Sequence, residues 1–223
     1  MNRVTSILFM LAIVLLGCGP KPSVSPATDY YYQNPHKNLS SVGRVVIVEL
    51  ANESSYPSAS GDITEALFQA LQKKQMFSLS VVSRSDPTWQ SIQADSTLGR
   101  QLGEVRNGQQ YTLEQLAITR KILNCNAVLI GSVTQYRPYP HMVMGLRLKL
   151  VDLTDSQLLW AAEQIWDTAD KTTENRAGLY FKTQMRADFE PLREDLVVVS
   201  PIRFMKFVAY EVSETIRNNV RNR

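Results

Sequence analysis

The chain has 223 residues and a formal net charge of +3, because 24 Lys and Arg residues face 21 Asp and Glu residues. Acidic and basic side chains are interspersed, so the sequence has no basic footprint of the kind that binds nucleic acid. Two cysteines are too few for a fold built on disulfides. The length is enough for one well-packed domain or two small ones.

An apolar run of about ten residues, 7–16, follows a single positive charge at Arg3. A helix that spans a membrane needs roughly twenty apolar residues, so this shorter run is typical of an export signal. The run ends in LLGC, residues 15–18, which resembles the bacterial lipobox, where a peptidase cuts before the cysteine and its thiol carries a diacylglycerol. We expect residues 1–17 to be a signal peptide and Cys18 to be the lipid attachment site. A plain signal peptide with an incidental cysteine is the alternative.

The residues after Cys18 predict the location of the protein. In enteric bacteria an aspartate at the next position favours the inner membrane, and Gly19 stands there instead. We therefore expect the periplasmic face of the outer membrane, with the inner membrane as the alternative. Residues 18–41 contain four prolines and no apolar periodicity, which predicts a lipidated cysteine followed by a flexible tether. The three tyrosines 30–32 either lie on the domain or bind a partner.

Five segments have the pattern of β-strands. Residues 45–48 and 127–133 are continuous apolar runs, typical of strands that are buried on both faces. Residues 142–150 alternate, which predicts one buried and one wet face. In residues 158–166, Trp160 and Trp166 have the same parity and should face the same side. The fifth strand is expected at residues 77–82.

Helical periodicity or helix-start signals occupy most of the remaining chain. We expect helices at residues 62–74, 89–94, 112–123, 171–188 and 201–219. In the third of these, Ile118 and Ile122 lie on a different face from Leu113 and Leu116, which predicts that this helix is covered on more than one side. The order of elements predicts an α/β fold. A mixed sheet of about five strands packs with helices in residues 42–170, and residues 171–223 form a helical extension packed on that domain.

Three stretches carry a resemblance to a known group of proteins. They are RVVIVELANES, DITEALFQALQKKQMFSLSVVSR and NAVLIGSVTQYRPYPHMVMGLRLKLVDLTDSQLLW. Together they resemble the periplasmic domain of the curli secretion-pore superfamily, which takes in the lipoprotein activators of penicillin-binding proteins and resembles the amino-terminal domain of TolB. The resemblance covers roughly residues 42–167 and leaves residues 171–223 unexplained. The curli pore inserts hairpins whose strands must be about nine to eleven residues long. The loops at 137–141 and 86–110 do not match that pattern, so we expect no channel.

The sequence lacks the common catalytic motifs. It has no Gly-x-Ser-x-Gly elbow, phosphate-binding loop, dinucleotide glycine pattern or His-Glu-x-x-His. We therefore expect no enzymatic activity, no cofactor, no metal site and no small-molecule substrate. The stretch from His141 to Met144 could suggest a copper(I) site. Strand alternation, however, places Met142 and Met144 opposite His141 and predicts core methionines. Cys125 precedes an apolar run, which predicts a buried thiol.

The turn YRPYPH, residues 136–141, contains two prolines among aromatic and charged residues. Tyrosine and arginine are the residues that most often anchor protein interfaces. We predict that Tyr136, Arg137, Tyr139 and His141 bind a partner protein. An ordinary cap on a hairpin is the alternative.

These observations predict a lipoprotein, without enzymatic activity, that contacts membrane lipid through Cys18. Its domain would bind other envelope proteins, either of a secretion apparatus or of peptidoglycan synthesis. The second hypothesis is a homo-oligomer, a self-assembling ring subunit of an envelope secretion complex.

Overall fold

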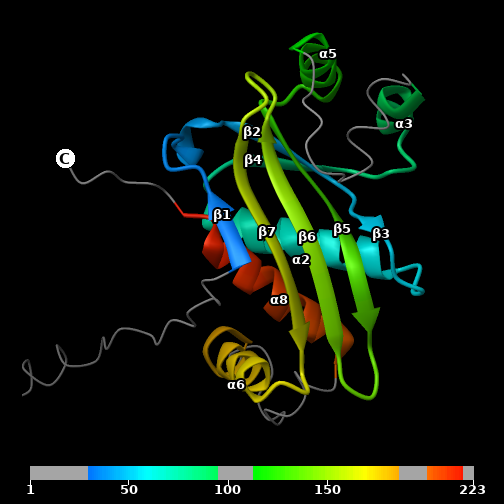
Figure 1. Ribbon diagram of the computed structural model, residues 1–223, viewed down its shortest axis with the longest axis vertical. Coiled ribbons are helices and arrows are strands. Elements are labelled where there is room, and N and C mark those ends of the chain that lie inside the picture. Colours follow the sequence, from blue (N-terminus) through cyan, green and yellow to red (C-terminus); the bar gives the residue numbers. More distant parts are fainter. Residues whose placement is uncertain (1–29, 95–112, 186–199, 218–223) are drawn as a thin grey trace, which may run out of the picture.

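The computed structural model describes residues 30–94, 113–185 and 200–217, which surround one mixed sheet (Figure 1). The strand order is β1-β7-β6-β5-β2-β4, and β3 pairs with β5 beside this path. The strands are β1 (Tyr31–Gln33), β2 (Arg44–Val48), β3 (Ala51–Asn52), β4 (Ser78–Val82), β5 (Ala127–Arg137), β6 (Val143–Asp152) and β7 (Leu158–Asp167).

Five α-helices and two short helical turns complete the described part of the chain. They are η2 (Leu39–Ser41), α2 (Ala59–Lys74), α3 (Pro87–Ala94), α5 (Leu113–Leu123), α6 (Lys171–Tyr180), the π-helical turn η3 (Phe181–Met185) and α8 (Pro201–Thr215). Each expected helix is present. Of the two carboxyl-terminal helices, the first changes to the π-helical turn after Tyr180 and the second ends at Thr215. The expected α/β class, with a carboxyl-terminal helix on a mixed sheet, is confirmed.

The five expected strands are β2, β4, β5, β6 and β7, and two short strands add to them. The pairs β2–β4 and β2–β5 are parallel, whereas β5, β6, β7 and β1 pair in antiparallel fashion. The difference follows from the connections, because tight turns can join only antiparallel neighbours and parallel neighbours need a crossover. The sequence patterns of β1 and β3 are too short, at three and two residues, to reveal a strand.

Hydrophobic cores form on both faces of the sheet. The larger core lies beneath α2 and α8, which cross behind the sheet in Figure 1. The smaller core lies on the other face, beneath α3 and α5 at one end of the strands. In β2, Val45 and Ile47 join the larger core and Val46 and Val48 join the smaller one. The continuous apolar run therefore predicted a strand buried on both faces correctly.

The alternation predicted for β6 is present from Leu146 to Leu150, where Arg147 and Lys149 are partly exposed, whereas Val143 and Gly145 are buried on the face that was expected to be wet. The core-facing side of β6 contributes Met144, Leu146, Leu148 and Leu150 to the larger core, and Met142 joins them just before the strand. Trp160 and Trp166 of β7 also enter this core, as their shared parity predicts. On the opposite face Arg147 pairs with Glu163 across the two strands at 2.7 Å. That part of the sheet faces the viewer in Figure 1.

The environment of α5 differs from the expectation. Leu116 and Leu123 are buried against the smaller core, but Ile118 and Ile122 are 44% and 39% exposed. The prediction that this helix is covered on more than one side is therefore wrong. Cys125, just beyond the helix, is a buried free thiol as predicted. Burial raises its pKa to about 11.

Residues 30–41 lie on the domain, whereas the sequence predicts a flexible tether as far as residue 41. Strand β1 pairs with β7, from Tyr31 opposite Ala162 to Gln33 opposite Trp160. Leu39 is fully buried in the larger core. The sequence of this segment shows no periodic pattern, because only one buried leucine and one three-residue strand attach the segment to the domain.

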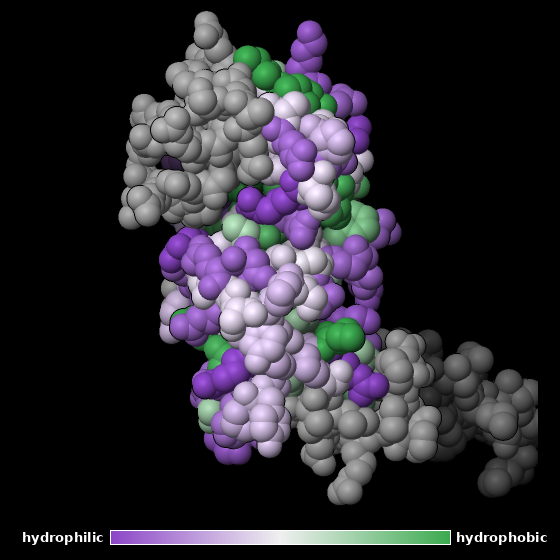
Figure 2. All heavy atoms as spheres, turned by 90° about the vertical axis from the view of Figure 1, so that its right-hand side faces the viewer, coloured by the Kyte–Doolittle hydropathy of each residue, from purple (hydrophilic) through white to green (hydrophobic). Residues whose placement is uncertain are grey.

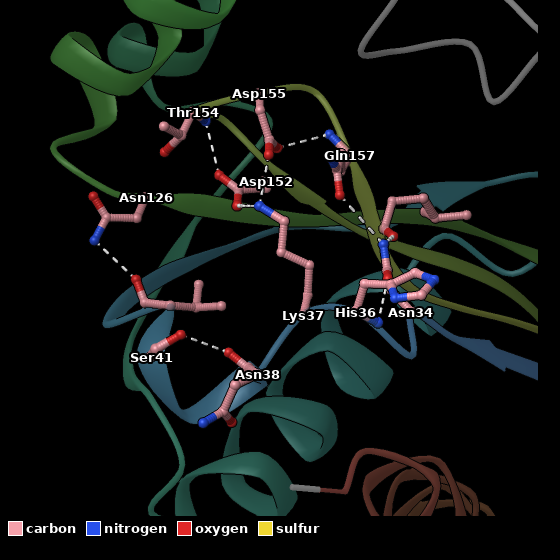
Figure 3. A network of polar contacts seen from close by, with 12 residues as sticks. Asn34, His36, Lys37, Asn38, Ser41, Asn126, Asp152, Thr154, Asp155 and Gln157 are labelled. Carbon is pink, nitrogen blue, oxygen red and sulfur yellow. Dashed lines mark hydrogen bonds and ion pairs between the residues drawn. The ribbon is translucent and has the colours of Figure 1, made fainter. Parts of the chain in front are cut away.

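A polar network fixes the same segment to the turn between β6 and β7 (Figure 3). Lys37 Nζ lies 3.2 Å from Asp152 Oδ2 and 2.6 Å from Asp155 Oδ2. The hydrogen bond to Asp155 raises the pKa of Lys37. Burial alone would raise the pKa of Asp155, but the hydrogen bond from Lys37 lowers it below its ordinary value. The segment after β1 is thus held by charge as well as by burial.

The carboxyl-terminal extension is attached through a buried carboxylate. Glu211 of α8 is 2% exposed and accepts hydrogen bonds from Trp166 Nε1 at 2.6 Å and from Arg176 Nε at 2.6 Å. Trp160 Nε1 donates to Thr215 Oγ1 at 3.1 Å. Asp170 caps the amino terminus of α6 by accepting hydrogen bonds from the backbone N–H groups of Thr172 and Thr173. Strand β7 therefore binds α8 directly, and Arg176 joins α6 to the same carboxylate of α8.

We predict that Glu211→Gln lowers the free energy of unfolding by about 3 kcal/mol, because it leaves the Arg176 charge without its partner in a largely buried site. Urea denaturation measures this value. The matched control is Glu214→Gln, which removes the partly exposed ion pair of Glu214 with Lys74 at 2.8 Å. The control should cost less than about 1 kcal/mol. Equal losses in the two variants would contradict the role given to Glu211.

Candidate functional site

The hairpin of β5 and β6 joins antiparallel strands of eleven and ten residues. Strand β2 pairs only with the start of β5, from Ala127 to Leu129, and β3 pairs with Ser132 and Val133. Beyond that point β5 pairs with β6 alone. The turn therefore extends past the parallel half of the sheet, at the lower end of the molecule in Figure 1.

Two backbone features shape this end of the hairpin. The register shifts between Val133 and Gln135, and Gly145 lies opposite Gln135. A Cβ atom at Gly145 would overlap Thr134 Oγ1, so the close approach at the bulge requires glycine. The base of the turn is fixed to the end of β7. Met142 N donates to Thr168 Oγ1 and Thr168 N donates to Met142 O, both at 2.9 Å.

The outermost residue of the turn is aromatic. Tyr139 is 81% exposed, the highest value among the exposed large hydrophobic residues in the described part of the chain. It stands between Pro138 and Pro140, and the Tyr139–Pro140 peptide is cis. His141 is also exposed. An exposed tyrosine on an anchored turn has the chemistry of an interface anchor, because its ring offers apolar area and its hydroxyl offers a hydrogen bond.

Arg137 lies on the same turn but extends along its side. Its Nε donates to the His141 carbonyl oxygen at 3.3 Å, and its Nη2 lies 3.9 Å from Asp167 Oδ2. Both side chains of this ion pair are substantially exposed, so the pair contributes little to stability. The guanidinium is therefore available to a partner at little cost to the fold.

Tyr136 points to the opposite face of the hairpin. It is paired with Met144 and packs against the core beneath α2 and α8. Its ring centroid lies 5.3 Å from that of Tyr56, with the planes at 83°, an edge-to-face contact. Burial raises the pKa of Tyr136, and the charge of Asp62 adds to the effect. The four predicted residues thus do not form one patch: Tyr139 and His141 lie outermost, and Arg137 and Tyr136 lie on different faces.

Tyr56 is a part of this end of the molecule that the sequence did not reveal. It belongs to the loop between β3 and α2 and is 41% exposed. Asn52 positions the loop, since its Nδ2 donates to Tyr56 O at 2.6 Å and its Oδ1 accepts from Ser54 N at 3.0 Å. The pairing of β3 with β5 brings this loop to the hairpin. A tyrosine next to Pro57 in an otherwise polar loop is the only sequence signal that could have indicated it.

The surface around the hairpin is mainly polar. Figure 2 shows the side of the molecule that lies at the right of Figure 1, and outside the grey atoms it is mostly hydrophilic to neutral. Its hydrophobic areas are small and separate, and some lie at the upper end. On this side a partner would therefore find local anchors and no broad apolar face.

The predicted lipid attachment site, Cys18, lies outside the described residues. Within residues 30–94, 113–185 and 200–217, none of the helices combines the length and the apolar character that a membrane crossing requires. The same ranges contain no group of three or more His, Cys, Asp and Glu residues that could hold a metal ion.

No protein-family model matches the chain, and no match was found among curated proteins. Several solved structures are similar to it. The PelC dodecamer from Paraburkholderia phytofirmans has 15% identity and a TM-score of 0.42, over 69% of this chain and 91% of that one. Lipoprotein GNA1162 from Neisseria meningitidis has 14% identity and a TM-score of 0.41, over 65% and 97%. The LpoB carboxyl-terminal domain from Escherichia coli has 16% identity and a TM-score of 0.35, over 56% and 82%. With TM-scores below 0.5, membership of the superfamily stays the prediction made from the sequence.

The structure predicts that Tyr139 and Tyr56 differ in what they contribute to stability. Tyr139→Ala should change the free energy of unfolding by less than about 0.5 kcal/mol, because its ring is exposed. Tyr56→Ala should cost about 1 kcal/mol through the lost edge-to-face contact with Tyr136. Urea denaturation of both variants tests the difference. A Tyr139→Ala variant that is as destabilised as Tyr56→Ala would show that Tyr139 packs on the domain.

Proposed function

We propose that this protein is a lipid-anchored protein of the cell envelope that binds another protein through the turn between β5 and β6, without catalysing a reaction. The observation that carries the proposal is the exposure of Tyr139 at the end of a hairpin whose base is fixed by Met142 and Thr168. An exposed tyrosine on a turn whose base is held loses little backbone freedom on binding, which favours a role as an interface anchor.

The anchor is supported by the residues around Cys18. The short apolar run, the LLGC sequence and Gly19 favour a lipoprotein on the periplasmic face of the outer membrane. Two or three acyl chains would make that attachment stable, whereas one chain would not. Because the described domain begins at residue 30, eleven residues lie between it and Cys18. Eleven residues span at most about 40 Å, so a lipid on Cys18 would keep the domain close to the membrane.

The partner is proposed to belong to envelope machinery, either a secretion apparatus or peptidoglycan synthesis, which is what the sequence resemblance implies. Tyr139 would enter a pocket on that partner, while Arg137 supplies a directional charge from the side of the hairpin. The proposal of binding without catalysis rests on the motifs that the sequence lacks. A second copy of this chain is the other partner that the crosslinking experiment below would detect.

We predict that cells fed an alkyne analogue of palmitate will label the wild-type protein and will not label Cys18→Ser. Gel fluorescence after click coupling measures the label. Cys125→Ser is the matched control, because Cys125 is the only other cysteine in the chain and is buried. That control should keep the full label. Equal labelling of wild type and Cys18→Ser would remove the anchor from the proposal.

Photocrosslinking in intact cells tests the binding surface. A benzoylphenylalanine in place of Tyr139 should capture a discrete envelope protein, because the side chain at this position would be enclosed by the partner. The control replaces Ile202, which is 64% exposed on α8, with the same residue. Adding Arg137→Ala to the Tyr139 probe should reduce the yield severalfold. The same pattern of products from positions 139 and 202 would refute the assignment of the turn.

A further inference from the structure

A basic cavity lies at the other end of β6 from the turn that contains Tyr139. It has a volume of about 780 Å³ and forms where β2 begins, α5 ends and the chain leaves β6. Three cationic side chains line it, Arg44 from β2 and Arg120 and Lys121 from α5. The polar side chains of Asn124, Asn126 and Thr154 complete its wall, and the lining contains no carboxylate.

The three cations have no acidic partner among the described residues. The ion pairs of this part of the chain involve other lysines and arginines. The adjoining turn between β6 and β7 has two carboxylates, Asp152 and Asp155, but both bind Lys37 (Figure 3). The charge of Lys37 therefore partly compensates the charges of these two carboxylates and weakens their effect on the cavity. The lining keeps an excess of positive charge.

Hydrogen bonds hold the wall of the cavity in place. Arg120 Nη2 donates to Asn126 Oδ1 at 3.2 Å, and Asn126 Nδ2 donates to the Val42 carbonyl oxygen at 2.8 Å. Asn126 N donates to the Arg44 carbonyl oxygen at 2.9 Å, which joins the start of β2 to the start of β5. Burial raises the pKa of the Cys125 thiol, and the charges of Arg44 and Arg120 oppose that rise. The charges of both guanidinium groups therefore act on Cys125, which lines the cavity.

The stability of α5 accounts for only part of this arrangement. Arg120 and Lys121 stand in the last turn of the helix, where a cation is favoured by the helix dipole. Arg44 belongs to β2, so the preference for cations in the last turn of α5 does not by itself account for its presence in the cavity. Its position beside the other two brings like charges together, which is unfavourable until an anion binds between them.

The chemistry of the lining fits a phosphate group. Guanidinium groups bind phosphate oxygens through two parallel hydrogen bonds, and lysine adds a point charge. The amide and hydroxyl groups of Asn124 and Thr154 offer further donors. The volume lies in the range of pockets for drug-sized ligands and is much larger than a single phosphate ion. The bound molecule should therefore carry a phosphate on a larger body.

We propose that this cavity binds the phosphate of a larger phosphorylated ligand, with a phospholipid headgroup at the membrane surface as its source. Only the choice of a lipid source rests on the proposed function, because the domain would then stand within reach of a membrane. The phosphate chemistry rests on the cavity alone. A soluble phosphomonoester is the other source of the same group, and the experiment separates the two.

The test uses the chain from residue 19 onward, which lacks the signal peptide and the lipid. Its binding to vesicles of phosphatidylglycerol with phosphatidylcholine, and of phosphatidylcholine alone, is measured by flotation. Binding of glycerol 3-phosphate is measured by calorimetry. The double variant Arg44→Gln with Lys121→Gln removes two cations that are exposed. The matched control is Lys73→Gln with Lys206→Gln, which removes two exposed lysines from the groove between α2 and α8.

We expect wild type and control to bind the anionic vesicles, and the cavity variant to bind them at least tenfold more weakly. If only glycerol 3-phosphate binds, and the cavity variant loses that binding, the phosphate site is supported with a soluble ligand as its source. Equal losses in the two double variants, or no binding of either probe by wild type, would overturn the proposal. Circular dichroism melting confirms that both variants are folded. The palmitate experiment is independent, so an unlabelled Cys18 would leave the cavity result unaffected.

Discussion

The position of α8 on the sheet depends on the ion pair and hydrogen bonds of the buried Glu211 carboxylate. A buried charge is tolerated only where an opposite charge and hydrogen bonds compensate for lost hydration. Glu211 meets this condition only when Arg176 of α6 and Trp166 of β7 are both in place. The need for both partners therefore selects one position of α8 on the sheet. Together α8 and α2 form the helical layer that covers the larger core.

This helical layer covers one face of the sheet and leaves both ends of the β6 strand accessible. The ten residues of β6 span about 34 Å. At one end the chain turns through the exposed Tyr139, and at the other it borders the basic cavity with Arg44. An aromatic anchor suits a protein surface, whereas a group of uncompensated cations suits an anion. The two proposed contacts are thus separated along one rigid strand, so that they would not compete for space.

The segment before β2 connects the domain to the region of the predicted anchor. Strand β1 covers the edge of β7, which would otherwise present unpaired backbone groups. Lys37 then binds Asp152 and Asp155 at the same end of the sheet as the basic cavity. Because residues 30–41 are attached to the domain, only residues 19–29 would separate that attached segment from a lipid on Cys18, which would limit the distance between the domain and the membrane. The longer tether that composition suggested would have allowed a greater distance.

The sequence by itself determined the elements whose signal is local and periodic. The runs at β2 and β5 reflect burial on both faces of the sheet, and the alternation in β6 and the matched tryptophans of β7 reflect repeated burial of one face. Both kinds of burial leave a regular pattern in the order of the residues. Long-range contacts decided the rest, because they involve single side chains distant in sequence. Only the tertiary structure placed Tyr56 against Tyr136, attached residues 30–41 and brought Arg44 beside Arg120 and Lys121. It also separated the four predicted residues of the turn. Tyr136 and Arg137 are consecutive residues of a strand and therefore point to opposite faces of the hairpin, whereas Tyr139 lies in the turn itself.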